Sequence, residues 1–173
     1  MTDLTVSIDE DAVMSTLGDL ITIYVSCPVV QGQINRVPMP DGDLVMMTQL
    51  SAVPLSTNIN NYGSTTKTLM RPTQFTVQLD FYGENSMARS SSISAILRDE
   101  VGTDFFTASG YDMQTLYASD AKQMPLVTGE EQYMARWTLS AVLQINQVIT
   151  LPVETANTLT VDIINVDATF PPL

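Results

Sequence analysis

Two long stretches of the sequence alternate between apolar and polar residues with a period of two. One runs from Phe75 to Tyr82, and in the other, from Tyr133 to Ile145, every odd position is apolar. Successive side chains of a strand point to opposite faces, so one row would enter a core and the other would face solvent or a neighbouring chain. The sequence therefore predicts a sheet scaffold, although this pattern alone names no function.

Two helices are predicted to pack on this sheet. Acidic residues 9–11 suit a helix start, and an apolar stripe follows from Val13 to Tyr24 at spacings of three and four. A second helix is expected to begin near Ser86 and to end or bend at Gly102. No repeat or linker divides the chain, which predicts one α+β domain over residues 1–173, with a mostly antiparallel sheet.

The other strands and loops are expected from apolar runs and turn residues. Leu44 to Val53 is apolar on both faces, as in a central strand, whereas Pro72 requires either a later strand start or an edge position. Short or bulged strands are expected at residues 29–31, 113–117 and 159–168, and loops at residues 35–43, 58–63 and 118–125.

The charge balance argues against tight binding to nucleic acid or to anionic membranes. The chain has 19 acidic and 7 basic residues, a net charge of −12, and its cations are scattered from Arg36 to Arg136. No apolar run approaches the ~20 residues that span a bilayer, and the first residues have no basic signal region. The acidity serves either solubility or a surface that lies near DNA without binding it.

The sequence offers few candidate catalytic residues. The chain has no histidine and one cysteine, Cys27, which excludes His-based nucleophilic systems and Cys/His zinc sites. Asp41 and Asp43 with Asn35 offer oxygen ligands, but they lack calcium-loop spacing, which favours a turn. A carboxylate dyad from distant residues stays open as an alternative. We therefore predict no catalytic residue, no metal and no cofactor, and we expect a structural protein instead.

Four segments in a fixed order resemble the neck or tail terminator proteins of tailed phages and prophages. They are residues 32–43 (GQINRVPMPDGD), 71–83 (RPTQFTVQLDFYG), 97–100 (LRDE) and 117–125 (YASDAKQMP), and the similarity extends from about residue 9 to residue 167. This resemblance implies a hexameric ring in the virion neck, assembled in the host cytoplasm, that caps the tail tube and meets head-completion or adaptor proteins. DNA would pass through a lumen whose carboxylates repel phosphates.

Two loops are the predicted interfaces. Prolines lower the entropy cost of ordering a contact loop, and Met, Tyr and Arg are frequent in interfaces. The alternative is that both loops only pack on their own subunit. The first loop contains Arg36, Val37, Pro38, Met39 and Pro40, and the second contains Tyr117, Asp120, Lys122, Gln123, Met124 and Pro125.

Two other functions compete with this hypothesis. A tail tube protein is also a sheet-rich ring former, but its subunits stack on copies of themselves. A carbohydrate-binding β domain would need several exposed aromatic side chains, whereas the only tryptophan, Trp137, falls in the row predicted to point inward.

Overall fold

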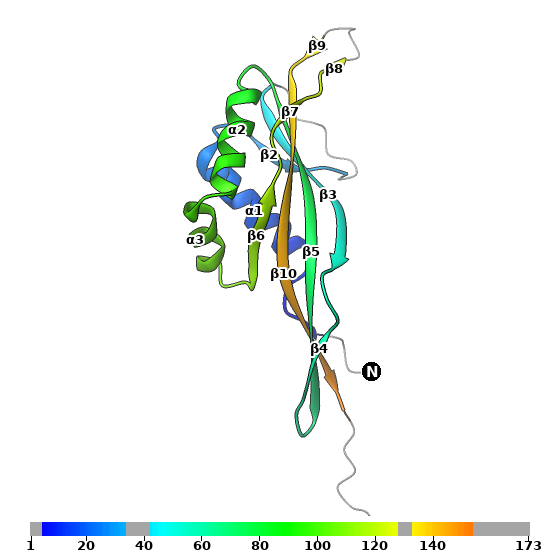
Figure 1. Cartoon of the computed structure of the whole chain (residues 1–173). Coiled ribbons are helices and arrows are strands. Elements are labelled where there is room, and N and C mark those ends of the chain that lie inside the picture. Colours follow the sequence, from blue (N-terminus) through cyan, green and yellow to red (C-terminus); the bar gives the residue numbers. More distant parts are fainter. Residues whose placement is uncertain (1–4, 34–41, 128–132, 154–173) are drawn as a thin grey trace, which may run out of the picture.

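Two strands of 17 residues, β5 (Thr66–Tyr82) and β10 (Arg136–Pro152), pair antiparallel along the length of the molecule (Figure 1). The computed structural model describes residues 5–33, 42–127 and 133–153. The stretch from Phe75 to Tyr82 lies in β5, and residues 136–145 of the other stretch lie in β10, with Leu143 opposite Phe75, so both predicted strands are confirmed over these residues. The predicted start at Tyr133 is wrong, because Tyr133 and Met134 pair with Val127 and Leu126 instead. β10 continues seven residues beyond Ile145, the predicted end, because it keeps pairing with the first half of β5.

The other strands flank this pair in an eight-stranded sheet, which is antiparallel except between β2 and β3. The side of β5 carries β3 (Leu44–Pro54), β2 (Val29–Gln31) beyond it, and β4 (Ile59–Tyr62). The outer edge of β10 carries β1 (Thr5–Val6), β6 (Met113–Ala118) and β7 (Lys122–Gln123). A separate two-stranded sheet consists of β8 (Leu126–Val127) and β9 (Tyr133–Met134).

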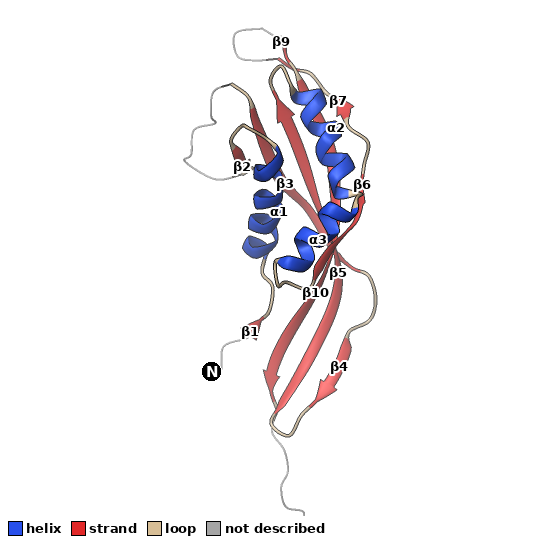
Figure 2. Ribbon diagram, turned by 90° about the vertical axis from the view of Figure 1, so that its left-hand side faces the viewer, coloured by secondary structure: helices blue, strands red, loops and turns tan. Residues whose placement is uncertain are grey.

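Three helices cover one face of the sheet, α1 (Glu10–Tyr24), α2 (Ser86–Leu97) and α3 (Glu100–Ala108) (Figure 2). The α+β class is therefore confirmed, but the prediction of two helices is wrong. The chain breaks after α2, and the Asp99 carboxylate accepts a hydrogen bond from the Val101 amide at 3.1 Å to start α3.

Gly102 lies inside α3 and does not end a helix as predicted. It is buried, and a Cβ at this position would lie 2.5 Å from the carbonyl oxygen of Ile96. The missing side chain therefore allows α3 to pack directly against the end of α2. Sequence reasoning interpreted this glycine as the end or a bend of the second helix, because local propensity does not reveal such close packing.

The start of α1 is as predicted. Asp9 caps the helix, its carboxylate accepting from the Ala12 amide at 2.8 Å, and Val13 and Leu17 are buried. Tyr24 was expected in the same buried stripe but is 45% exposed, since it is the last residue of the helix.

The core lies between the three helices and the inward row of the sheet. On the opposite face, β5 and β10 present polar and half-buried side chains, and none of the described helices covers them. The fully buried inward row consists of Phe75, Val77, Leu79 and Phe81 from β5 and of Leu139, Ala141, Leu143 and Ile145 from β10.

Pro72 lies within β5, at a local edge of the sheet. Its carbonyl accepts from the Leu55 amide at 2.9 Å, in the gap between the end of β3 and the start of β4. A residue's nitrogen and carbonyl point to the same side of a strand, so the missing N–H of Pro72 removes no bond from the ladder with β10. The loops expected at residues 58–63 and 118–125 are wrong in part, because they contain β4 and β7.

On the N-terminal side of Pro72 in β5, the sheet continues past the helices as an arm (Figures 1 and 2). We define the arm as β4 with residues 66–72 of β5 and 146–152 of β10; β1 pairs with it at Thr150. The seven β5 residues span about 20 Å at the rise of a strand. The strand expected at residues 159–168 lies outside the described residues.

Candidate assembly interface

The second predicted loop follows the outer edge of β10. Tyr117 pairs with Val142, and further along the Met124 amide donates to the Arg136 carbonyl at 2.8 Å. The segment is therefore held at both ends, and the structure brings the six predicted residues onto one edge of the sheet. All six side chains are exposed: Tyr117, Asp120, Lys122, Gln123, Met124 and Pro125.

Arg98, at the end of α2, holds the first part of this edge in place. Its guanidinium donates to the Ala118 carbonyl and lies 3.0 Å from the Asp120 carboxylate, while its Cζ lies 5.6 Å from the centre of the Tyr117 ring. The Asp120 side chain is 86% exposed, so this ion pair contributes little energy. Sequence reasoning missed the role of Arg98, since no spacing rule connects residue 98 with residues 117–120.

The β8–β9 hairpin extends the exposed edge with apolar side chains. Val127 is 55% exposed and Tyr133 is 82% exposed. Two short paired strands without a core beneath them are marginally stable in water. The hairpin was not predicted, because the sequence between residues 109 and 132 mixes polar and apolar residues without a clear period.

The first predicted loop, Arg36, Val37, Pro38, Met39 and Pro40, lies outside the described residues. The chain on either side of it is anchored to the body. The Gly32 amide donates to the Met47 carbonyl at 2.6 Å, and the Asp43 carboxylate forms an ion pair with Arg89 at 2.6 Å. Asp43 thus has a structural partner, which argues against its alternative role as a cation ligand.

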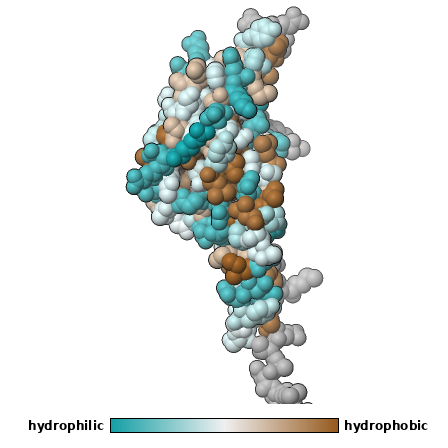
Figure 3. All heavy atoms as spheres, viewed as in Figure 1, coloured by the Kyte–Doolittle hydropathy of each residue, from teal (hydrophilic) through white to brown (hydrophobic). Residues whose placement is uncertain are grey.

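The arm carries a second exposed apolar surface, which sequence reasoning did not single out. Ile59 is 50% exposed, and Tyr62, at 72%, has the Lys67 ammonium 4.9 Å from its ring centre. Space-filling atoms show apolar side chains on the arm as well as on the body (Figure 3). Ile59 pairs with Met70 and Tyr62 with Lys67, so the two side chains lie on opposite faces of the arm and each face exposes one of them.

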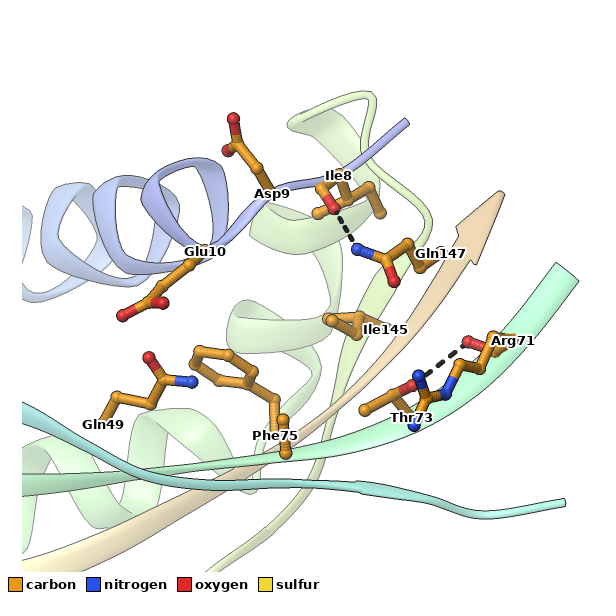
Figure 4. Close-up of a pocket in the computed structure, with 10 residues that line it drawn as sticks. Ile8, Asp9, Glu10, Gln49, Arg71, Thr73, Phe75, Ile145 and Gln147 are labelled. Carbon is orange, nitrogen blue, oxygen red and sulfur yellow. Dashed lines mark hydrogen bonds between the residues drawn. The ribbon is translucent and has the colours of Figure 1, made fainter. Parts of the chain in front are cut away.

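A pocket of about 250 Å³ lies at the base of the arm, beside the start of α1 (Figure 4). Phe75 and Ile145 line its apolar side. Two of its polar groups have structural roles: Asp9 caps α1, and the Gln147 amide donates to the Ile8 carbonyl at 2.8 Å. Among the residues described here, no group of three His, Cys, Asp or Glu side chains is placed to hold a metal ion.

Three groups in the described part of the chain have pKa values shifted away from neutrality. Burial raises the pKa of the Cys27 thiol and that of the Tyr82 hydroxyl, and a hydrogen bond with Asp80 raises the pKa of Arg136. A general acid or base works best with a pKa near the operating pH, so these three groups are poorly suited to such catalysis.

The described residues define an α+β fold that exposes apolar side chains along one edge of its sheet and on its arm. The sequence matches the family model of the phage neck terminator protein over residues 11–169. The chain therefore belongs to the phage neck terminator family, which confirms the resemblance and makes it a structural component of the phage neck. No individual curated protein matches the sequence. No helix in the described part of the chain is long and apolar enough to cross a membrane.

Proposed function

We propose that this chain forms a hexameric ring in the neck of the virion. The ring is assembled in the cytoplasm of the host. The ring ends the tail tube and joins it to the head-completion or adaptor proteins. The observation that carries this proposal is the family match, which covers residues 11–169. The fold supports it, because the edge at Tyr117 to Pro125, the β8–β9 hairpin and the arm all expose apolar side chains.

The edge and the hairpin are the surfaces that we assign to the junction. Met124 is 53% exposed, and Leu126 and Val127 continue the apolar surface directly after it. Methionine adapts its shape to a partner, and the backbone of this edge is already ordered by β10, so little further entropy is lost on contact. The loop at Arg36 to Pro40 is proposed as the second contact, on its composition alone.

The lumen of the ring is the proposed path for DNA. The subunits around the lumen are acidic, and their carboxylates repel DNA phosphates over roughly 8 Å at physiological salt. This repulsion allows the duplex to slide. Retention of duplex DNA by the purified ring at physiological salt would contradict this part of the proposal.

The proposal is tested by electron microscopy of a lysate from a phage that lacks this gene. We expect filled heads beside unattached tails, some of them longer than normal, and joined virions when the gene is supplied from a plasmid. Heads without any tail tube would indicate a tube protein instead. Normal joined virions in the absence of the gene would exclude a role in the neck.

A further inference from the structure

The inward face of the sheet continues onto the arm but loses its helix cover there. On the body, Phe75 and Ile145 belong to this face and are buried beneath helices. On the arm, the same face carries Leu69 opposite Ile149, and both side chains are only half-buried. The arm therefore presents a sheet surface of the kind that a helix covers elsewhere in this molecule.

This face of the arm is also cationic, in contrast to the rest of the chain. Lys67 and Arg71 lie on it, and neither forms an ion pair with a carboxylate among the described residues. The sequence has no Asp or Glu between Asp43 and Asp80, or between Arg136 and residue 154. Lys67 and Arg71 are thus the charged residues of the arm on a chain whose net charge is −12, and Arg71 borders the pocket that Asp9 and Glu10 also line.

A complementary surface lies on the body, formed by α3 and the edge strand β6. It combines the exposed carboxylates of Glu100 and Asp104 with Val101 and Leu116, which are 46% and 47% exposed. This combination of negative charge and exposed apolar side chains matches the positive and apolar face of the arm.

A hollow of about 370 Å³ lies on this surface between the end of α2, α3 and β6, and Arg98, Thr103 and Leu116 are among the residues that line it. Thr115 also lines it, and the hydroxyl of Thr115 is buried without a hydrogen-bond partner in the described part of the chain. Buried polar groups normally have partners, so this hydroxyl is available to a donor or acceptor that enters the hollow.

We infer that the arm of each subunit docks on the α3–β6 surface of the next copy of this chain. Tyr62, which is 72% exposed, enters the hollow beside Leu116, where its hydroxyl reaches Thr115. Lys67 and Arg71 then face the carboxylates of α3. The α3 helix of one copy thereby supplies the cover that the arm of another lacks.

The arm and the α3–β6 surface are different parts of the molecule, so the contact is heterologous. A heterologous contact produces a closed ring when its rotation closes, and an open filament when it does not. The inference rests on the proposed ring and specifies its subunit interface.

Charge reversal tests the inference in a phage that lacks the gene, complemented from a plasmid. Lys67→Glu/Arg71→Glu should lower the yield of joined virions by at least about tenfold, as should Glu100→Lys/Asp104→Lys, because each pairs like charges. The protein that carries all four substitutions should recover most of the yield, since the charges are again opposite. A thermal melt of each purified protein verifies that it folds.

A matched control separates local pairing from net charge. Asp11→Lys/Asp19→Lys makes the same change of charge on exposed positions of α1, and it should not rescue the arm variant. Rescue by this control, or failure of the fourfold variant to recover, would overturn the inference. Normal virions without the gene would instead remove the proposed function, so the two failures are distinguishable.

Disulfide crosslinking locates the contact directly. In a Cys27→Ser background, Tyr62→Cys together with Leu116→Cys should give multimers of this chain when assembled virions are mildly oxidised. Each single-cysteine protein should give none. Crosslinking of Tyr62→Cys alone to another virion protein would show that the arm contacts a different partner and would refute docking between copies.

Discussion

The Arg136 guanidinium holds the Asp80 carboxylate in the sheet through contacts of 3.2 Å from Nε and 3.0 Å from Nη2. The Asp80 side chain is only 3% exposed, and the Gln78 amide donates a further hydrogen bond to it at 2.8 Å. These contacts from Arg136 and Gln78 offset part of the desolvation cost of burying the carboxylate.

Replacing Arg136 by methionine should therefore destabilise the fold by about 3 kcal/mol, because it leaves the Asp80 charge buried without its cation. The double variant Asp80→Asn/Arg136→Met should lose less, since no charge remains. Urea unfolding of the purified proteins measures both. Asp120→Asn, which breaks an ion pair whose carboxylate is 86% exposed, is the control and should cost less than about 1 kcal/mol. A similar loss in both single variants would contradict the difference in burial.

Two glycines in helices should respond in opposite ways to alanine. Gly102→Ala places a Cβ 2.5 Å from the Ile96 carbonyl oxygen and should destabilise by about 1–3 kcal/mol, since backbone must move. At Gly18 the nearest atom is the flexible end of Met47, at 3.1 Å, so Gly18→Ala should be neutral or gain up to about 1 kcal/mol from helix propensity. Thermal unfolding distinguishes the two, and equal effects would contradict the close packing of α2 and α3.

The elements that the sequence predicted well share a clear period. The alternation of Phe75 to Tyr82 and of Tyr133 to Ile145 identified the central pair of strands, and the Asp9 cap placed the start of α1. These signals are local, because a strand or helix buries its own face.

The elements that were missed depend on contacts between distant segments. β4 and β7 are short and polar, and each forms only because β5 or β10 is already beside it. The break between α2 and α3 depends on Gly102 approaching Ile96, which no local pattern shows. The arm was missed because the length of β10 is set by its partner strand.

The predicted interface loops are tested by introducing a charge. Met124→Asp should leave the monomer folded, since the side chain is 53% exposed, and it should block assembly of the ring or the junction by burying an unpaired carboxylate. Met39→Asp is predicted to act in the same way on the first loop. Thermal melts verify folding, and electron microscopy counts joined virions. Normal assembly of either variant would remove that loop from the interface.

The Cys27 thiol should react slowly at neutral pH. Burial raises its pKa, so less thiolate is present at pH 8 than in the unfolded chain. Alkylation by iodoacetamide should be slower in the folded protein than in urea, and its rate should rise at higher pH.

The same shift affects stability. The folded state favours the protonated thiol. The contribution of this thiol to the free energy of unfolding is therefore complete below the pKa of the unfolded chain, near 8.5, and is lost as the pH rises through the pKa of the folded protein. Between pH 8 and pH 10 the wild type should lose more stability than Cys27→Ser, measured by urea unfolding at each pH. Parallel curves would contradict a buried thiol.

The central position of β10 also determines when this chain can fold during its synthesis. β10 is the partner of β1, β5, β6 and β7, although it is the last of these strands to be translated. At about 5–20 residues per second, the ribosome needs several seconds to go from β5 to the end of β10. During this time β5 has neighbours on one edge only, and its other edge is open to other nascent chains. Host chaperones that bind extended segments would therefore protect this edge until β10 is translated.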